Sequence, residues 1–206
     1  MSNKLAVLIL FLLMSFFIKA QSFGGGAIAG ISTSQVGGDN LSGFNKAGLI
    51  IGVYANKLIS DLISLQMELT YIQKGSNNPK MNDANHSSFL KEDISMEYAE
   101  VPFIIQYHQS QKIKIEGGAY FSSLINAYYN DLNGQIPSSS SVFIKYDIGL
   151  IIGIDYIYSE KISLNSRISN SIIPLGAEDY NNSNTFNSKL KGKYNSVLSF
   201  ALHYNL

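Results

Sequence analysis

The sequence has 206 residues and no net formal charge, because 15 Lys and Arg residues balance 15 Asp and Glu residues. This balance excludes the basic field that binds nucleic acid. The absence of cysteine excludes disulfides, thiol chemistry and the lipidated cysteine of a bacterial lipoprotein. Aromatic residues reach 12%, with 13 Tyr and 11 Phe, which suits both a soluble all-β domain and a barrel with lipid-facing girdles.

The first residues predict a secretion signal. Lys4 supplies the positive start, Leu5 to Ile18 form an apolar run, and the small residue Ala20 precedes Gln21. The apolar run is shorter than the roughly 20 residues that a membrane-spanning helix needs. We therefore expect a signal peptide at residues 1–20 and a single mature domain at residues 21–206.

Polar and apolar residues alternate with a period of two through most of the mature chain. Ser64, Gln66 and Glu68, for example, interleave with Leu65 and Met67, so one strand carries a polar face and an apolar face. Runs of this kind, bounded by Gly, Asn, Ser and Pro, predict about eight strands. We place them at Phe23–Thr33, Lys46–Asn56, Leu62–Lys74, Ser95–His108, Lys112–Ala127, Phe143–Tyr158, Lys161–Ile173 and Lys193–Asn205.

The connections between these strands alternate strictly in length. The long polar ones are Ser34–Asn45, Gly75–Ile94, Tyr128–Val142 and Pro174–Gly192, and the short ones are Lys57–Asp61, Gln109–Gln111 and Ser159–Glu160. Outer-membrane barrels have short periplasmic turns and longer extracellular loops. The sequence thus predicts an all-β fold, an eight-stranded antiparallel up-and-down transmembrane β-barrel in the bacterial outer membrane, with both termini periplasmic.

Strand parity assigns the charged residues to the inside of this barrel. The interior of an eight-stranded barrel is just wide enough for its own side chains, and charges buried there must be paired. We therefore expect a structural plug of ion pairs, in which five acids meet five bases: Glu68, Glu100, Lys112, Lys114, Glu116, Lys145, Asp147, Asp155, Lys161 and Arg167.

The seventh predicted strand departs from an apolar outer face. Ser166 and Asn170 share the outward parity with Leu164, Ile168 and Ile172. A protein contact within the membrane and a local bulge that shifts the parity both explain this pattern.

Five blocks in order resemble the successive strands of the PorT-like outer-membrane β-barrel family. They begin at Lys46 (KAGLIIGVY), Leu65 (LQMELTYIQKG), Tyr98 (YAEVPF), Ile115 (IEGGAY) and Asp147 (DIGLIIGIDY). The resemblance covers essentially the whole mature chain and implies an outer-membrane barrel. The namesake assists a secretion and gliding apparatus, a role that does not transfer on fold alone. The chain departs from the pattern at its end, where Leu206 stands in place of the usual aromatic residue.

Candidate chemistry is sparse. The inward carboxylates could form an acid–base or metal site, but neighbouring bases favour ion pairing. His108 and His203 lack a third metal ligand of matched spacing, and His86 falls in a long loop. Asp39–Asn40 and Asn82–Asn85 suit loose calcium binding as well as ordinary loop chemistry. We expect no catalytic residues, no metal and no cofactor.

These observations favour a barrel with a packed polar lumen that has a structural, assembly or loop-mediated binding role. The expected partners are outer-membrane lipid and an envelope protein reached through the long loops, with no nucleic acid. The alternatives are a narrow pore or small-solute transporter, an outer-membrane enzyme and a soluble lipocalin-like binder.

Overall fold

The computed structural model describes residues 23–37, 43–77, 93–131, 134–136, 143–176 and 192–206. The predicted signal peptide lies outside these residues. Within them, no helix is long and apolar enough to cross a membrane. The described residues form the strands β1 (Gly24–Gly37), β2 (Lys46–Ser60), β3 (Ile63–Asn77), β4 (Asp93–His108), β5 (Ile113–Asp131), β6 (Gly134–Ile136), β7 (Tyr146–Ile157), β8 (Ile162–Ser171) and β9 (Tyr194–Asn205).

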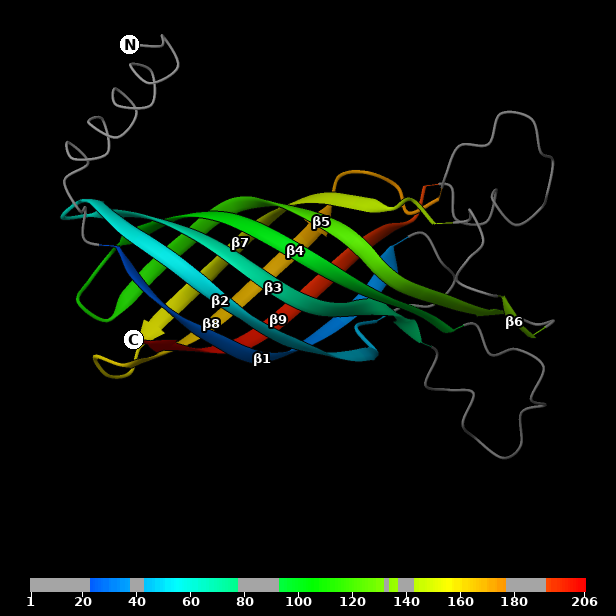
Figure 1. Ribbon diagram of the computed structural model, residues 1–206, viewed down its shortest axis with the longest axis horizontal. Coiled ribbons are helices and arrows are strands. Elements are labelled where there is room, and N and C mark those ends of the chain that lie inside the picture. Colours follow the sequence, from blue (N-terminus) through cyan, green and yellow to red (C-terminus); the bar gives the residue numbers. More distant parts are fainter. Residues whose placement is uncertain (1–22, 38–42, 78–92, 132–133, 137–142, 177–191) are drawn as a thin grey trace, which may run out of the picture.

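Eight of the described strands close into an antiparallel barrel (Figure 1). The order around the wall is β4, β3, β2, β1, β9, β8, β7 and β5, and the pairing of β4 with β5 completes the ring. The short strand β6 pairs only with the end of β5, outside the wall. Closure leaves no unpaired edge, which is the condition for a sheet to cross a bilayer.

The predicted fold class is therefore confirmed, with differences at the strand ends. The sixth predicted strand starts at Tyr146, whereas Phe143 makes an isolated bridge with Gly176. Strand β6 lies in the predicted loop Tyr128–Val142 and forms an unpredicted hairpin, in which Gly134 pairs with Asp131. The dipeptide Asn133-Gly134 is a hairpin signal that could have indicated it.

The outer wall of the barrel is apolar. Large hydrophobic side chains point away from the lumen and remain highly exposed, including Leu69 at 57%, Phe103 at 55% and Ile152 at 71%. Exposed tyrosines lie toward strand ends, as Tyr146 and Tyr156 do in β7. An apolar band flanked by aromatic residues is the pattern of a lipid-facing barrel wall.

The two ends of the barrel differ in their connections. At one end, here called the turn end, short turns join β2 to β3, β4 to β5 and β7 to β8, and β1 begins and β9 ends there (Figure 1). Serine hydroxyls fix two of these turns, because Ser110 and Ser159 accept hydrogen bonds from the amides of Ile113 and Ile162. The opposite end, called the loop end, carries the longer connections.

Candidate functional site

The inward side chains form three charged clusters inside the barrel. Side chains alternate along most of each strand, so residues of one parity on β3, β4, β5, β7 and β8 converge on the lumen. We name the clusters after their cations, Arg167, Lys74 and Lys114.

The Arg167 cluster joins the four strands β3, β4, β5 and β8. The guanidinium of Arg167 donates to both carboxylate oxygens of Glu68, at 2.8 and 2.7 Å, and its Nε donates to Glu116 at 2.7 Å. Glu116 also accepts hydrogen bonds from Gln106 at 2.7 Å and from Asn165 at 2.8 Å. The bidentate bond to Glu68 uses the planar fork of arginine, which a lysine cannot reproduce.

The Lys74 cluster lies closer to the loop end. The ammonium group of Lys74 is fully buried and lies 2.5 Å from a carboxylate oxygen of Glu100 and 3.5 Å from one of Asp147. The rings of Tyr120 and Tyr98 lie 4.1 and 5.1 Å from the same nitrogen, so aromatic faces complete the cage around the cation. The Tyr120 hydroxyl donates to Asp147 at 3.1 Å.

The third cluster is a single ion pair nearer the turn end. Lys114 lies 3.3 Å from Asp155, whose side chain is 1% exposed. The imidazole of the buried His203 packs against the ring of Tyr54, with centroids 5.3 Å apart. His108 at the end of β4 shares a hydrogen bond of 2.9 Å with the hydroxyl of Ser64.

The structure brings most of the predicted lumen charges together. Glu68, Glu100, Lys114, Glu116, Asp147, Asp155 and Arg167 all point into the barrel and lie in the three clusters.

The remaining predicted bases, Lys112, Lys145 and Lys161, are exposed, and the sequence analysis was wrong to place them in the lumen. The physical reason is that they lie just outside strand ends, where parity no longer fixes the direction of a side chain.

Lys74 is a lumen residue that was not predicted, although it shares the parity of Glu68 and Thr70 on β3. Continuing that alternation to the end of the predicted strand would have found it.

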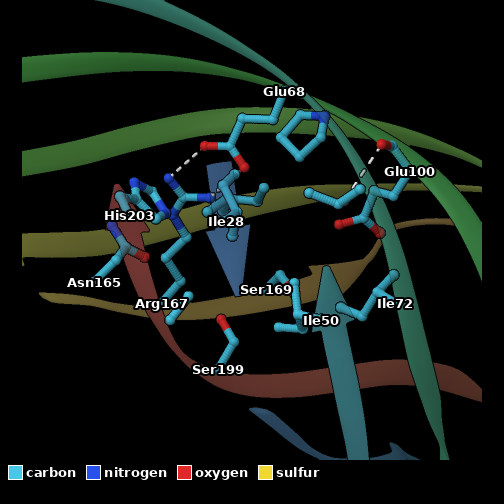
Figure 2. Close-up of a pocket in the computed structure, with 14 residues that line it drawn as sticks. Ile28, Ile50, Glu68, Ile72, Glu100, Asn165, Arg167, Ser169, Ser199 and His203 are labelled. Carbon is cyan, nitrogen blue, oxygen red and sulfur yellow. Dashed lines mark hydrogen bonds and ion pairs between the residues drawn. The ribbon is translucent and has the colours of Figure 1, made fainter. Parts of the chain in front are cut away.

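The three clusters contain five carboxylates but only three cationic side chains. The predicted balance of five acids and five bases is thus not found within these clusters, although Lys193 is also buried, at 7% exposure. A cavity of about 30 Å³ separates the Arg167 and Lys74 clusters. Figure 2 shows Arg167, Glu68 and His203 on one side of this cavity and Glu100 on the other. Its volume, and the charged groups among its mixed polar and apolar lining, suit one or two water molecules.

An apolar layer lies inside the barrel toward the loop end. Its members include Val36, Ile94, Met96 and Val197, each at most 1% exposed. Leu175, which follows β8, packs against this layer, and its backbone amide donates to the carbonyl of Lys193 at 2.9 Å. Side chains from β1, β4 and β9, together with Leu175, therefore meet inside the barrel at this level.

The geometry of the described residues bears on whether a metal ion could be held. Within them, no group of three or more His, Cys, Asp or Glu residues is arranged to hold a metal ion. The loop candidates Asp39–Asn40, Asn82–Asn85 and His86 lie outside the described residues.

Comparison with protein families identifies the chain. The family model described as "Outer membrane protein beta-barrel domain" matches residues 18–176. The chain belongs to this family. Membership of the outer-membrane barrel family assigns the protein to the bacterial outer membrane, in agreement with the apolar outer wall.

Solved structures agree with the family in fold. Ail, the attachment invasion locus protein of Yersinia pestis, was solved in complex with the heparin analogue sucrose octasulfate; it is 13% identical, with a TM-score of 0.52 over 90% of this chain and 99% of Ail. Neisserial surface protein A is 16% identical, with a TM-score of 0.52 over 88% of this chain and 96% of that one. At these identities the similarity shows the fold alone. Among curated proteins, none matches the sequence.

Proposed function

We propose that this outer-membrane barrel is non-conducting and acts through its loop end, as a structural, assembly or binding protein. The observation that carries the proposal is the filled lumen. Val36, Ile94, Met96 and Val197 meet inside the barrel at no more than 1% exposure, and the Lys74 cage lies fully buried beside them. An ion crossing this level would have to displace packed apolar side chains.

We propose that the lumen charges are structural and that the protein is not an enzyme. Glu68 and Glu116 both serve as acceptors for Arg167, and Glu100 serves Lys74. Carboxylates held in this way stabilise the fold, whereas a general acid or base needs access to a substrate proton.

The proposed orientation sets the turn end in the periplasm and the loop end outside the cell. Short periplasmic turns and long extracellular loops are typical of outer-membrane barrels. Both termini of the mature chain are then periplasmic. The sequence blocks beginning at Lys46, Leu65, Tyr98, Ile115 and Asp147 support PorT-like membership within the family.

The charge of the long connections bears on the ligand class. Between the strands, they contain six lysines (Lys80, Lys91, Lys145, Lys189, Lys191, Lys193) and five acidic residues (Asp39, Asp83, Glu92, Glu178, Asp179). This near balance gives no strong positive field for a sulfated polyanion such as the sucrose octasulfate solved with Ail. An envelope protein or a neutral polar surface suits these Asn- and Ser-rich connections better.

Conductance in planar lipid bilayers tests the filled lumen. The purified wild-type protein is expected to give no steady current, with an open porin in the same membranes as the positive control. Stable, ion-selective channels from the wild type would contradict the proposal and favour the narrow-pore alternative.

A pull-down from detergent-solubilised outer membranes tests the role of the loops. We expect a specific envelope protein to be retained by the intact chain and lost when residues 78–92 or 177–191 are replaced by short Gly-Ser turns. Replacement of Gln109–Gln111 at the turn end is the matched control and should leave retention unchanged. If all the variants retained the envelope protein equally, the loops would not form the binding site.

A further inference from the structure

Strand β8 presents polar side chains on the lipid-facing wall. Ser166 and Asn170 alternate there with Leu164, Ile168 and Ile172, which are 49%, 54% and 57% exposed. The pairing of β8 with β7 and with β9 runs without a register shift over the described strand. A local bulge therefore does not explain the pattern, and both polar side chains face outward.

These two side chains lack hydrogen-bond partners. Among the described residues, none forms a hydrogen bond with the hydroxyl of Ser166 or with the side-chain amide of Asn170. Asn170 stands between the exposed Ile168 and Ile172, one residue before the end of β8, and pairs with Leu150 of β7 and Ser196 of β9. Hydrocarbon supplies neither donors nor acceptors, so polar groups that face it are unfavourable until another molecule pairs with them.

The wall is also hollowed beside Ser166. A depression of about 420 Å³ runs across β1, β9 and β8, which lie side by side in Figure 1. The small side chains of Ala29 and Ser166 lie between larger ones from the same strands, namely Ile31, Leu164, Phe200 and Leu202. Ile168, the next outward residue on β8, projects beside the depression as a ridge.

We propose that the wall formed by β8, β9 and β1 binds a second copy of this chain within the membrane. An asparagine amide both donates and accepts, so two Asn170 side chains related by a two-fold axis satisfy each other. A two-fold contact requires one self-complementary patch, and this patch carries both a hollow and a ridge. Lipid chains would fill the hollow but leave Ser166 and Asn170 unpaired.

Cysteine cross-linking tests the contact directly, because the natural chain contains no cysteine. Ser166→Cys and Asn170→Cys are each made in the full chain, reconstituted in liposomes at a high lipid-to-protein ratio and treated with a short thiol cross-linker. The expected result is several-fold more covalent dimer than with Leu69→Cys, an exposed position on β3 in the opposite wall. Equal cross-linking at all three positions would show random collision and overturn the proposal.

A second measurement separates the contact from folding. Asn170→Leu with Ser166→Phe removes both polar groups and fills the hollow, so we expect a loss of dimer in mass photometry of detergent-solubilised protein while the barrel keeps its gel mobility. A wild-type protein that is monomeric at every concentration, or that cross-links in cells only to a different protein, would refute the second copy as the occupant.

Discussion

Arg167 is the residue on which the lumen depends most. Its side chain is 9% exposed and bonds to two carboxylates. Arg167→Ala is expected to lower the free energy of unfolding by about 3–5 kcal/mol, because it leaves Glu68 and Glu116 buried without a cation. Since the chain has no Trp, urea unfolding is best followed by circular dichroism and gel mobility.

A variant without charges in the Arg167 cluster is the control for Arg167→Ala. The combination of Arg167→Met, Glu68→Gln and Glu116→Gln removes the cation and both charges together, and it should be milder than Arg167→Ala alone. If the triple variant were the less stable one, the cluster would be held by its packing and not by its charges.

Loss of the Lys74 cation should also destabilise the barrel, because the Lys74 side chain is more deeply buried than that of Arg167. Lys74→Met keeps an unbranched side chain but leaves Glu100 and Asp147 unpaired in a fully buried cage, so we expect a loss of about 3–5 kcal/mol. Lys46→Met is the matched control, because the pair of Lys46 with Asp93 is 17% and 24% exposed and should contribute no more than about 1 kcal/mol. Equal losses in urea titrations would show that burial does not determine the strength of these pairs.

Within strand β7, Gly149 makes room for Tyr120. A Cβ at Gly149 would lie 2.4 Å from the Tyr120 ring and 2.3 Å from the carbonyl oxygen of Asn170. Gly149→Ala should therefore push the ring away from Lys74 and cost about 1–3 kcal/mol. Gly117→Ala on β5, where a Cβ meets nothing within 4 Å, should be close to neutral. Thermal unfolding of the two variants compares them, and similar melting temperatures would contradict the close packing of Tyr120.

The outward face of β7 tests the lipid contact of the wall. Ile152 is 71% exposed, and Ile152→Arg would place a charge in the hydrocarbon at a cost of about 2–4 kcal/mol. Gln111→Arg, in the exposed turn between β4 and β5, is expected to assemble normally. Assembly is measured as the fraction of heat-resistant compact barrel in outer membranes, and equal fractions would argue against lipid at Ile152.

For the molecule as a whole, closure of the barrel wall predicts slow unfolding. Every strand of the described barrel is paired on both sides, so unfolding must break the ring cooperatively. The mature protein should sediment with outer membranes and migrate faster on a gel before boiling than after it. Mature protein free in a periplasmic extract would favour the soluble lipocalin-like alternative.

Features that depend on local periodicity could be predicted from the sequence alone. Alternation along β3 and β7 placed Glu68, Asp147 and Asp155 inside, and the connection lengths gave the up-and-down order. These features can be predicted because the direction of the side chains in a strand repeats every second residue.

Which of these charges meet depends on the folded barrel and could not be predicted from the sequence. Arg167 and Glu68 are 99 residues apart in the chain, and their pairing depends on how the wall closes across the lumen. The same closure buried Lys74, whereas Lys112, Lys145 and Lys161 lie beyond the strand ends and reach solvent. Parity gives the face of each residue, but the stagger between strands sets its depth and its partner.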